Sequence, residues 1–182
     1  MITHFYADPH FGHANIIQHA ERPFADVREM DAELERRYCA VVSDQDVVLW
    51  VGDASFADDA WTAALLTRLP GHKLLVRGNH DGTLTRCLKL GFEVVADFLH
   101  LLVAGHKVTA SHFPPAGATQ DVRCPERRPP KPGPGEFVLH GHTHERARRV
   151  GRRIHVGVDA WGFAPVTRAE VEGLIAKEEA QP

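Results

Sequence analysis

The first half of the chain alternates short apolar runs with helical patterns, and this order restricts the fold more than any other feature of the sequence. The runs "ITHFYA", "VVLWV" and "KLLV", at residues 2–7, 47–51 and 73–76, are typical of strands, and two of them are almost continuously apolar. Helical patterns follow at about residues 26–42, 58–69 and 83–90. A β-α-β-α-β-α order predicts parallel strands joined by crossover helices, and therefore an α/β fold.

The second half of the chain has a different pattern. "LHLLV" and "KVTAS" flank Ala104-Gly105-His106 and predict a hairpin, "RIHVGV" predicts a further strand, and a last helix is expected at about residues 167–177. We expect these strands to be mainly antiparallel. Residues 114–135 hold seven of the 12 prolines and show no apolar periodicity. We expect a disordered loop or a surface excursion there rather than a lid.

Composition sets limits on the class of protein. At 182 residues the chain is long enough for one domain with a substantial core, so we expect a single domain over residues 1–182. The formal net charge of -3 argues against a sequence-independent grip on nucleic acid. No leader pattern and no membrane-length apolar run is visible, so we expect a cytoplasmic protein without a membrane partner. The three cysteines are widely spaced, which fits a reducing compartment and disfavours a thiol-ligated zinc site. The oligomeric state is not fixed by the sequence.

Polar side chains that can bind metal follow five separate predicted strands. The clusters are "ADPH", "GD", "GNHD", "SHF" and "HGHTH", in chain order. In open α/β sheets, sites form just beyond the carboxyl ends of strands. Turn chemistry explains one such cluster, but not five that all carry His, Asp or Asn. Together the clusters predict one shared site.

The stretch "HGHTH" is ambiguous by itself, because short histidine tracts are only suggestive of metal binding. Side chains two residues apart in extended backbone point the same way, so His140, His142 and His144 could face one spot. Gly141 permits a tight bend between the first two.

The donor types favour two metal ions over one. A structural zinc usually has four ligands with cysteine among them, whereas these clusters offer seven nitrogen and oxygen donors. They are Asp8, His10, Asp53, Asn79, His112, His142 and His144. We expect two divalent ions per chain, with Mn as the first choice and Fe, Zn or Ni as alternatives. A carboxylate can bridge two such ions roughly 3.5–4 Å apart, and the pair then clamps both oxygens of a displacement at phosphorus.

The ordered motifs D-x-H, G-D, G-N-H-D, a lone His and G-H-x-H resemble those of the calcineurin-like metallophosphoesterases. "DPHFGHANII" and "VGVDAWGFAPV" further resemble a small bacterial and phage subgroup of that family. The resemblance implies an α/β fold of four layers, an α-β-β-α sandwich with two mixed central sheets flanked by helices, and a dinuclear metal site. The chain departs from the family pattern at Pro9 and Ala54, neither of which is a ligand.

The resemblance also implies a role for individual residues. The first metal would be held by Asp8, His10 and His144, and the second by Asn79, His112 and His142, with Asp53 bridging both. His80 would be the general acid that contacts phosphate, with Asp81 orienting it. His140 matches no family ligand and is expected to be structural or to support the ligands.

Further features leave alternatives open. His13 is a candidate substrate contact, with helix capping or packing as the alternative. Arg77 is a candidate phosphate contact unless it pairs with a carboxylate. The five arginines between Arg146 and Arg153 are interpreted as a solvated hairpin, with a nucleotide or nucleic-acid grip as the alternative. No expected ligand lies in residues 114–135, so we expect that loop to be dispensable for hydrolysis of a small ester.

We therefore expect a metal-dependent phosphoesterase in which a metal-bridging hydroxide attacks phosphorus. Phosphodiesters are favoured because the short chain leaves little room for a capping domain. The alternatives are a phosphomonoesterase or nucleotide pyrophosphatase at the same site, and a non-catalytic metal-binding interaction module. His80 favours an enzyme, because metal binding alone does not need it. The expected partner is a small phosphate ester or nucleotide rather than nucleic acid.

Overall fold

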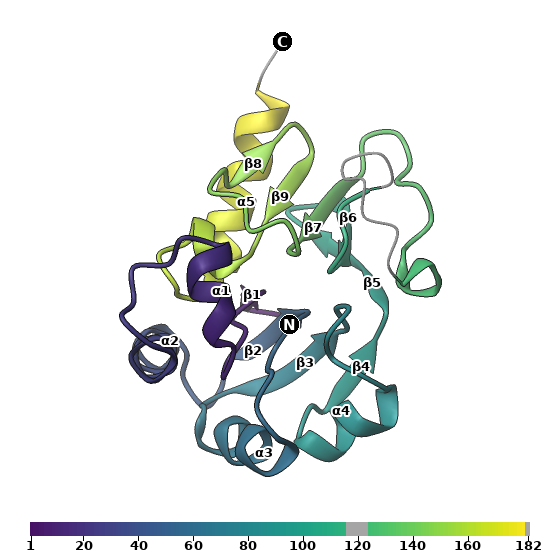
Figure 1. The fold of residues 1–182 in the computed structure, drawn as a ribbon. Coiled ribbons are helices and arrows are strands. Elements are labelled where there is room, and N and C mark those ends of the chain that lie inside the picture. Colours follow the sequence, from purple (N-terminus) through teal and green to yellow (C-terminus); the bar gives the residue numbers. More distant parts are fainter. Residues whose placement is uncertain (116–123, 181–182) are drawn as a thin grey trace.

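The computed structural model has two five-stranded sheets that pack face to face, and it describes residues 1–115 and 124–180 (Figure 1). The first sheet has the strand order β10-β1-β2-β3-β4. Its strands are β1 (His4–Tyr6), β2 (Val47–Val51), β3 (His72–Val76), β4 (Val94–Ala96) and β10 (Val166–Thr167). Neighbours from β1 to β4 are parallel, as the alternating pattern predicts, and β10 is antiparallel to β1.

The first half of the chain has four helices, and three of them begin where the sequence provides a capping side chain. The four are α1 (Ala14–His19), α2 (Val27–Val41), α3 (Asp59–Arg68) and α4 (Leu84–Leu90). Asp26, Asp58 and Thr83 each accept a hydrogen bond from the first turn of α2, α3 and α4. The short helix α1 was not predicted, because its N-cap residue His13 makes no capping bond and six residues show no clear periodicity.

The second sheet has the order β5-β6-β7-β9-β8. Its strands are β5 (Phe98–Val103), β6 (His106–Ser111), β7 (Phe137–His140), β8 (Arg149–Val150) and β9 (Arg153–His155). The predicted hairpin is formed by β5 and β6, but β6 pairs with β7 and β7 with β9 in parallel. The expectation of mainly antiparallel strands is therefore wrong, since the long connection after β6 lets the chain re-enter the sheet in the same direction. Two short 3₁₀ turns, η1 (Pro125–Arg127) and η2 (Val158–Ala160), and helix α5 (Arg168–Glu179) complete the fold.

Alternate side chains of the first sheet serve two separate cores. Tyr6, Trp50 and Leu75 face the layer formed by α2, α3 and α4, which lie together on one side of that sheet (Figure 1). Phe5, Leu49, Val51 and Val76 face the second sheet. Helix α5 adds Val171 and Ile175 to this inter-sheet cluster. Two mixed sheets with flanking helices are thus confirmed, whereas a regular four-layer sandwich stays a prediction.

No helix in the described part of the chain has both the length and the apolar composition that crossing a membrane requires.

Truncation of Leu34 tests the core between the first sheet and the helices α2, α3 and α4. Leu34 is fully buried in this cluster, so we expect Leu34→Ala to lower the free energy of unfolding by about 2–5 kcal/mol. Leu88→Ala on α4 is the matched control, because Leu88 is 50% exposed and its loss should cost under about 0.5 kcal/mol. Chemical denaturation of the two variants measures the difference, and equal losses would contradict the assigned core.

Candidate metal centre

The ends of five strands converge and bring two groups of Asp and His side chains together. The first group is Asp8, His10 and His144, and the second is Asp53, His112 and His142. Within each group, one potential ligand atom from every residue lies within 4.8 Å of the others. Asp8, Asp53 and His112 follow β1, β2 and β6, so the fold itself delivers them to one edge of both sheets. Each group could hold a metal ion.

The two groups adjoin at Asp53. Its Oδ2 atom lies 3.7 Å from Nε2 of His10 in the first group and 3.4 Å from Nε2 of His112 in the second. The Oδ1 atom of Asn79 lies 3.2 Å from the same His112 nitrogen, which adds an amide oxygen to the second group. One carboxylate therefore faces imidazoles of both groups, the position that a bridging ligand would take.

Two of the imidazoles are oriented through their second ring nitrogen. His112 Nδ1 lies 3.0 Å from the carbonyl oxygen of Val51, and His144 Nδ1 lies 2.8 Å from Oδ2 of Asp159. Bonds of this kind fix the tautomer of metal-binding histidines and turn the other nitrogen to the ion. His10 is almost fully buried, and neither of its ring nitrogens has a hydrogen-bond partner among the described residues. Because unsatisfied buried polar atoms are costly, the residues fit a metal site.

A buried ion pair that the sequence analysis did not assign supports the first group. Arg22 donates to both carboxylate oxygens of Asp159, at 2.9 and 3.0 Å, and both side chains are inaccessible to solvent. The same guanidinium donates to the carbonyl oxygens of Asp8 and Pro9. Asp159 lies in "VGVDAWGFAPV", which carries the family resemblance, but no local spacing links it to Arg22, 137 residues away.

The backbone of the site is strained. Five of the six residues in the two groups have positive φ: Asp8 (55°), His10 (54°), Asp53 (54°), His142 (71°) and His144 (52°). Left-handed backbone at a non-glycine residue costs of order 1–3 kcal/mol and clusters at functional sites. The extended-backbone argument for "HGHTH" is therefore wrong, since the turns at His142 and His144 send these two rings into different groups.

Three glycines allow backbone segments to approach the ligands. A Cβ at Gly52 would lie 2.3 Å from Nδ1 of His112, one at Gly78 would lie 2.2 Å from Oδ1 of Asp53, and one at Gly141 would lie 2.4 Å from Oδ2 of Asp8. All three distances are far below van der Waals contact, so only glycine leaves these side chains in place.

Burial and mutual charge set the protonation of the site without a cation. Burial raises the pKa of Asp8 to about 6. Burial also opposes the charged forms of Asp53 and His112, but the pair interacts strongly, which holds the pKa of Asp53 below its usual range and raises the pKa of His112 to about 9. Positive charge at this position is thus stabilised by the surrounding carboxylates, as a bound divalent cation would be.

His80 lies at the open edge of the site. Its backbone N–H donates to Oδ1 of Asp53 at 2.9 Å, its Nε2 lies 3.9 Å from Oδ2 of the same residue, and 36% of its side chain is exposed. Its ring lies 4.5 Å from Phe56, and the Phe56 ring also stacks on His13 at 3.9 Å and on His10 at 5.2 Å. His13 thus packs on an aromatic ring beside the site, and a substrate contact by this residue stays a prediction.

Two other candidates, Asp81 and Arg77, are members of neither group of potential ligands. Asp81 accepts backbone N–H bonds from Asp53, Ala54 and Gly78, and its role in orienting His80 stays a prediction. Burial raises the pKa of Asp81. Arg77 pairs with the carboxylate of Asp97. This pairing is the expected alternative to a phosphate contact.

His140 is buried and bonds the carbonyl of Gly141, and its ring centroid lies 5.2 Å from that of His155. It is therefore a structural residue behind the turn that carries His142.

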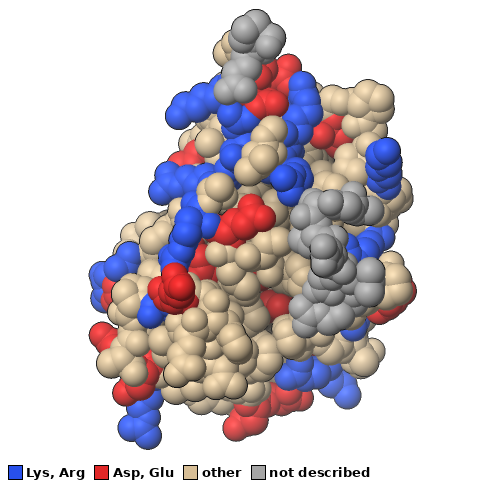
Figure 2. Space-filling model, turned by 45° about the horizontal axis from the view of Figure 1, so that its top comes forward, with Lys and Arg blue, Asp and Glu red and all other residues tan. Residues whose placement is uncertain are grey.

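The basic run between Arg146 and Arg153 is largely bound by other parts of the chain. Arg146 donates to the carbonyl oxygens of Ala20 and Asp159, and Arg148 lies over the ring of Trp161 at 4.1 Å. Arg149 and Arg152 pair with the acidic end of α5. Figure 2 shows Lys and Arg side chains over the upper part of one face, with Asp and Glu side chains among them. The contacts favour a structural role over a nucleic-acid grip.

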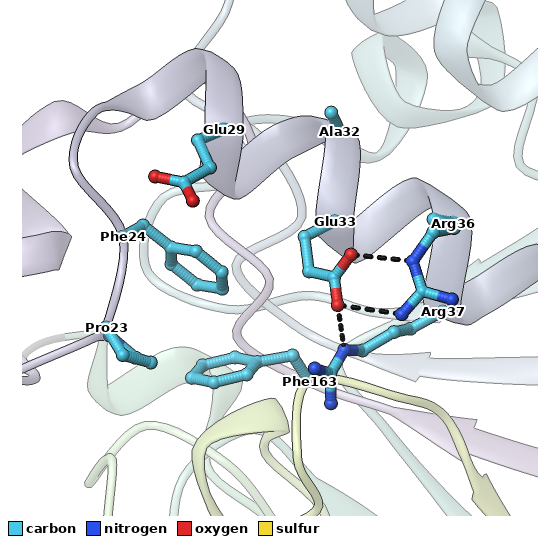
Figure 3. A pocket seen from close by; sticks show the side chains of 8 residues that line it. All are labelled: Pro23, Phe24, Glu29, Ala32, Glu33, Arg36, Arg37 and Phe163. Atoms are coloured by element: carbon cyan, nitrogen blue, oxygen red, sulfur yellow. Dashed lines mark hydrogen bonds and ion pairs between the residues drawn. The ribbon is translucent and has the colours of Figure 1, made fainter.

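A separate open pocket of about 440 Å³ lies between α2 and the loop at Phe163 (Figure 3). Phe24 and Phe163 form its apolar part, and Glu33 binds both Arg36 and Arg37 at its rim. Its lining includes none of the six residues of the two groups, and Glu33, Arg36 and Arg37 at its rim are already paired with one another.

Among known proteins, the chain is similar to a phage protein. It is 33% identical over 197 residues to the Gene 66 protein of Mycobacterium phage L5, which covers 95% of this chain and 93% of that protein. No model of a protein family matches the chain.

Two solved structures are similar. AQ665 from Aquifex aeolicus, a protein of unknown function, superposes with a TM-score of 0.69 and 23% identity over 94% of this chain and 97% of its own, which shows a shared fold. Yfce, a phosphoesterase from E. coli, superposes loosely, with a TM-score of 0.41 and 19% identity over 85% of this chain and 76% of its own. A function must therefore be argued from the site.

Gly78→Ala tests whether close backbone approach holds Asp53 in place. The added methyl group would displace the carboxylate, so we expect fewer Mn²⁺ ions bound per chain than in the wild type. Gly173→Ala in α5 is the matched control, because a Cβ there meets nothing within 4 Å and should leave metal content unchanged. Elemental analysis after gel filtration measures both, and full occupancy in Gly78→Ala would contradict the close contact.

Proposed function

This chain belongs to the family of the Gene 66 protein of Mycobacterium phage L5, and we propose that it is a metal-dependent phosphoesterase with two divalent cations. The observation that carries the proposal is the position of Asp53, whose Oδ2 faces His10 on one side and His112 on the other. A single structural ion would not need a carboxylate shared between two groups of donors. Mn²⁺ suits the mixed imidazole and carboxylate donors, with Fe, Zn and Ni as alternatives.

Each group of residues would hold one ion. Asp8, His10 and His144 would hold the first, and Asn79, His112 and His142 the second, with Asp53 between them. When bound, such a pair of ions lowers the pKa of a water molecule and neutralises charge on phosphoryl oxygens. The bonds to Val51 and Asp159 hold the rings of His112 and His144 through Nδ1, so that the other ring nitrogen of each would bind an ion.

His80 would donate a proton to the departing oxygen. Its backbone bond to Asp53 ties it to the centre of the site, while its partly exposed ring remains accessible to a substrate. General acid catalysis by a positioned side chain is worth about 10²–10⁴ in rate. We favour phosphodiesters as the substrate class, because the short chain leaves little room for a domain that would cap the site.

A substrate and metal screen tests the function. Purified protein should hydrolyse a nitrophenyl phosphodiester faster than the monoester when supplied with Mn²⁺, and Ni²⁺, Zn²⁺ and Mg²⁺ are tried in turn. A monoester preference would assign a phosphomonoesterase, and cleavage of nucleoside diphosphates alone a pyrophosphatase. Two bound ions without hydrolysis of any ester would indicate a metal-binding interaction module and refute the enzyme.

Asp53→Asn tests the shared carboxylate. Asparagine keeps an oxygen for the N–H of His80, so the fold should persist, but its neutral amide is a poor bridge between cations. We expect the variant to lose at least one Mn²⁺ per chain and most of its turnover. Near wild-type hydrolysis with full metal content would refute the bridging role.

His80→Ala tests the general acid. We expect a much smaller loss of turnover on a nitrophenyl diester, whose phenolate leaves without a proton, than on an alkyl or nucleoside diester, with metal content unchanged. His72→Ala is the control, because His72 is exposed, pairs with Glu93 and lies at the opposite end of β3. Equal losses across leaving groups would mean that His80 only binds phosphate.

A further inference from the structure

The second part of the Pro-rich stretch packs against the candidate site. Residues 116–123 lie outside the described part of the chain, but residues 124–135 are described. Arg127, at the end of η1, has a side chain that is only 14% exposed. None of residues 124–135 is fully buried, but the contacts of residues 124–128 argue against the expectation that the whole loop is dispensable for hydrolysis of a small ester.

Arg127 holds the loop that carries Asn79 and His80. Its guanidinium donates to the carbonyl oxygens of Gly78 and Gly82, the two glycines that bracket Asn79-His80-Asp81. Arg77 and Arg86 also donate to carbonyls of this loop, but they belong to its own flanks, the end of β3 and helix α4. Arg127 comes from 45–49 residues further along the chain and ties the loop to the other half of the fold.

The next residue reaches the second group from another direction. The guanidinium of Arg128 lies over the ring of Phe113, 4.6 Å from its centroid. Phe113 in turn lies edge-on to the rings of His112 and His142, with centroid distances of 5.1 Å to each. Consecutive arginines thus contact the loop of Asn79 and the aromatic ring that packs on two further members of the second group.

We propose that residues 124–128 form a strap that positions the second metal site, with Arg127 as its positioning residue. The strap fixes the carbonyl of Gly78, so the amide of Asn79 stays 3.2 Å from Nε2 of His112 and His80 stays on Asp53. The first group has no contact of this kind with the strap among the described residues and is held instead by Arg22 and Asp159. The inference rests on the proposed two-metal function and adds a selective effect on one of the two ions.

Titration of the purified full-length protein with Mn²⁺ tests the strap. Residues that support ligands from behind typically contribute 10- to 100-fold to metal affinity, so Arg127→Gln should weaken the second ion by about that factor and leave the first unchanged. Arg127→Lys keeps the charge but not the forked geometry of the guanidinium. Its affinity for the second ion should therefore lie between that of the wild type and that of Arg127→Gln. Turnover of Arg127→Gln should recover at high Mn²⁺.

Hydrogen exchange of the metal-free protein gives a reading that does not depend on bound metal. In Arg127→Gln, we expect faster exchange in residues 78–82 and unchanged exchange in residues 8–12. Arg152→Gln is the matched control, because Arg152 also donates to a backbone carbonyl, that of Gly135, but lies on the β8–β9 hairpin. It should match the wild type in both experiments.

The outcomes separate the two proposals. A wild-type protein that binds fewer than two Mn²⁺ ions would overturn the proposed function and this inference with it. Two ions in the wild type with unchanged affinities in Arg127→Gln would overturn the strap alone. Equal weakening of both ions, or faster exchange throughout the chain, would mean that Arg127 stabilises the fold in general and would also overturn it.

Discussion

The buried carboxylates at one edge of the two sheets need compensating positive charge or hydrogen bonds, and the rest of the site follows from how each obtains them. Asp159 is balanced by Arg22, and Asp81 accepts three backbone N–H bonds. Asp8 and Asp53 face imidazoles instead, whose charge depends on protonation. Asp8 and Asp53 also accept backbone N–H bonds from His142 and His80, but the positive charge beside them in the described part of the chain is that of titratable rings, which favours a divalent cation.

The same constraint explains the strained backbone. Several of the Asp and His residues that meet at the site have left-handed backbone, and the strain of these turns is offset by contacts made elsewhere. Arg22 binds the carbonyls of Asp8 and Pro9 within one such turn, and Asp81 binds the N–H of Asp53 within another. Both side chains are buried and bind backbone, so they support the residues of the two groups.

The support of the two groups is also asymmetric. The first group is supported by residues near its own loops and by the turn at Asp159. The second group is supported by Arg127 and Arg128, which come from the Pro-rich stretch. An insertion that looks free of core residues in the sequence thus reaches the site through two long cationic side chains. Such side chains can span several ångströms of surface and still bury their stems.

The sequence by itself determined the local elements and the donors. Strand periodicity, the three helical patterns of the first half and the polar clusters after the strands are short-range features, and the structure has strands, helices and polar side chains at these positions. Only the tertiary structure decided the parallel entry of β7, the turns that separate His142 from His144, and the distant bonds of Arg22 and Arg127. These depend on which loops meet after packing, and no periodicity or spacing along the chain encodes a contact between residues 49 or 137 positions apart.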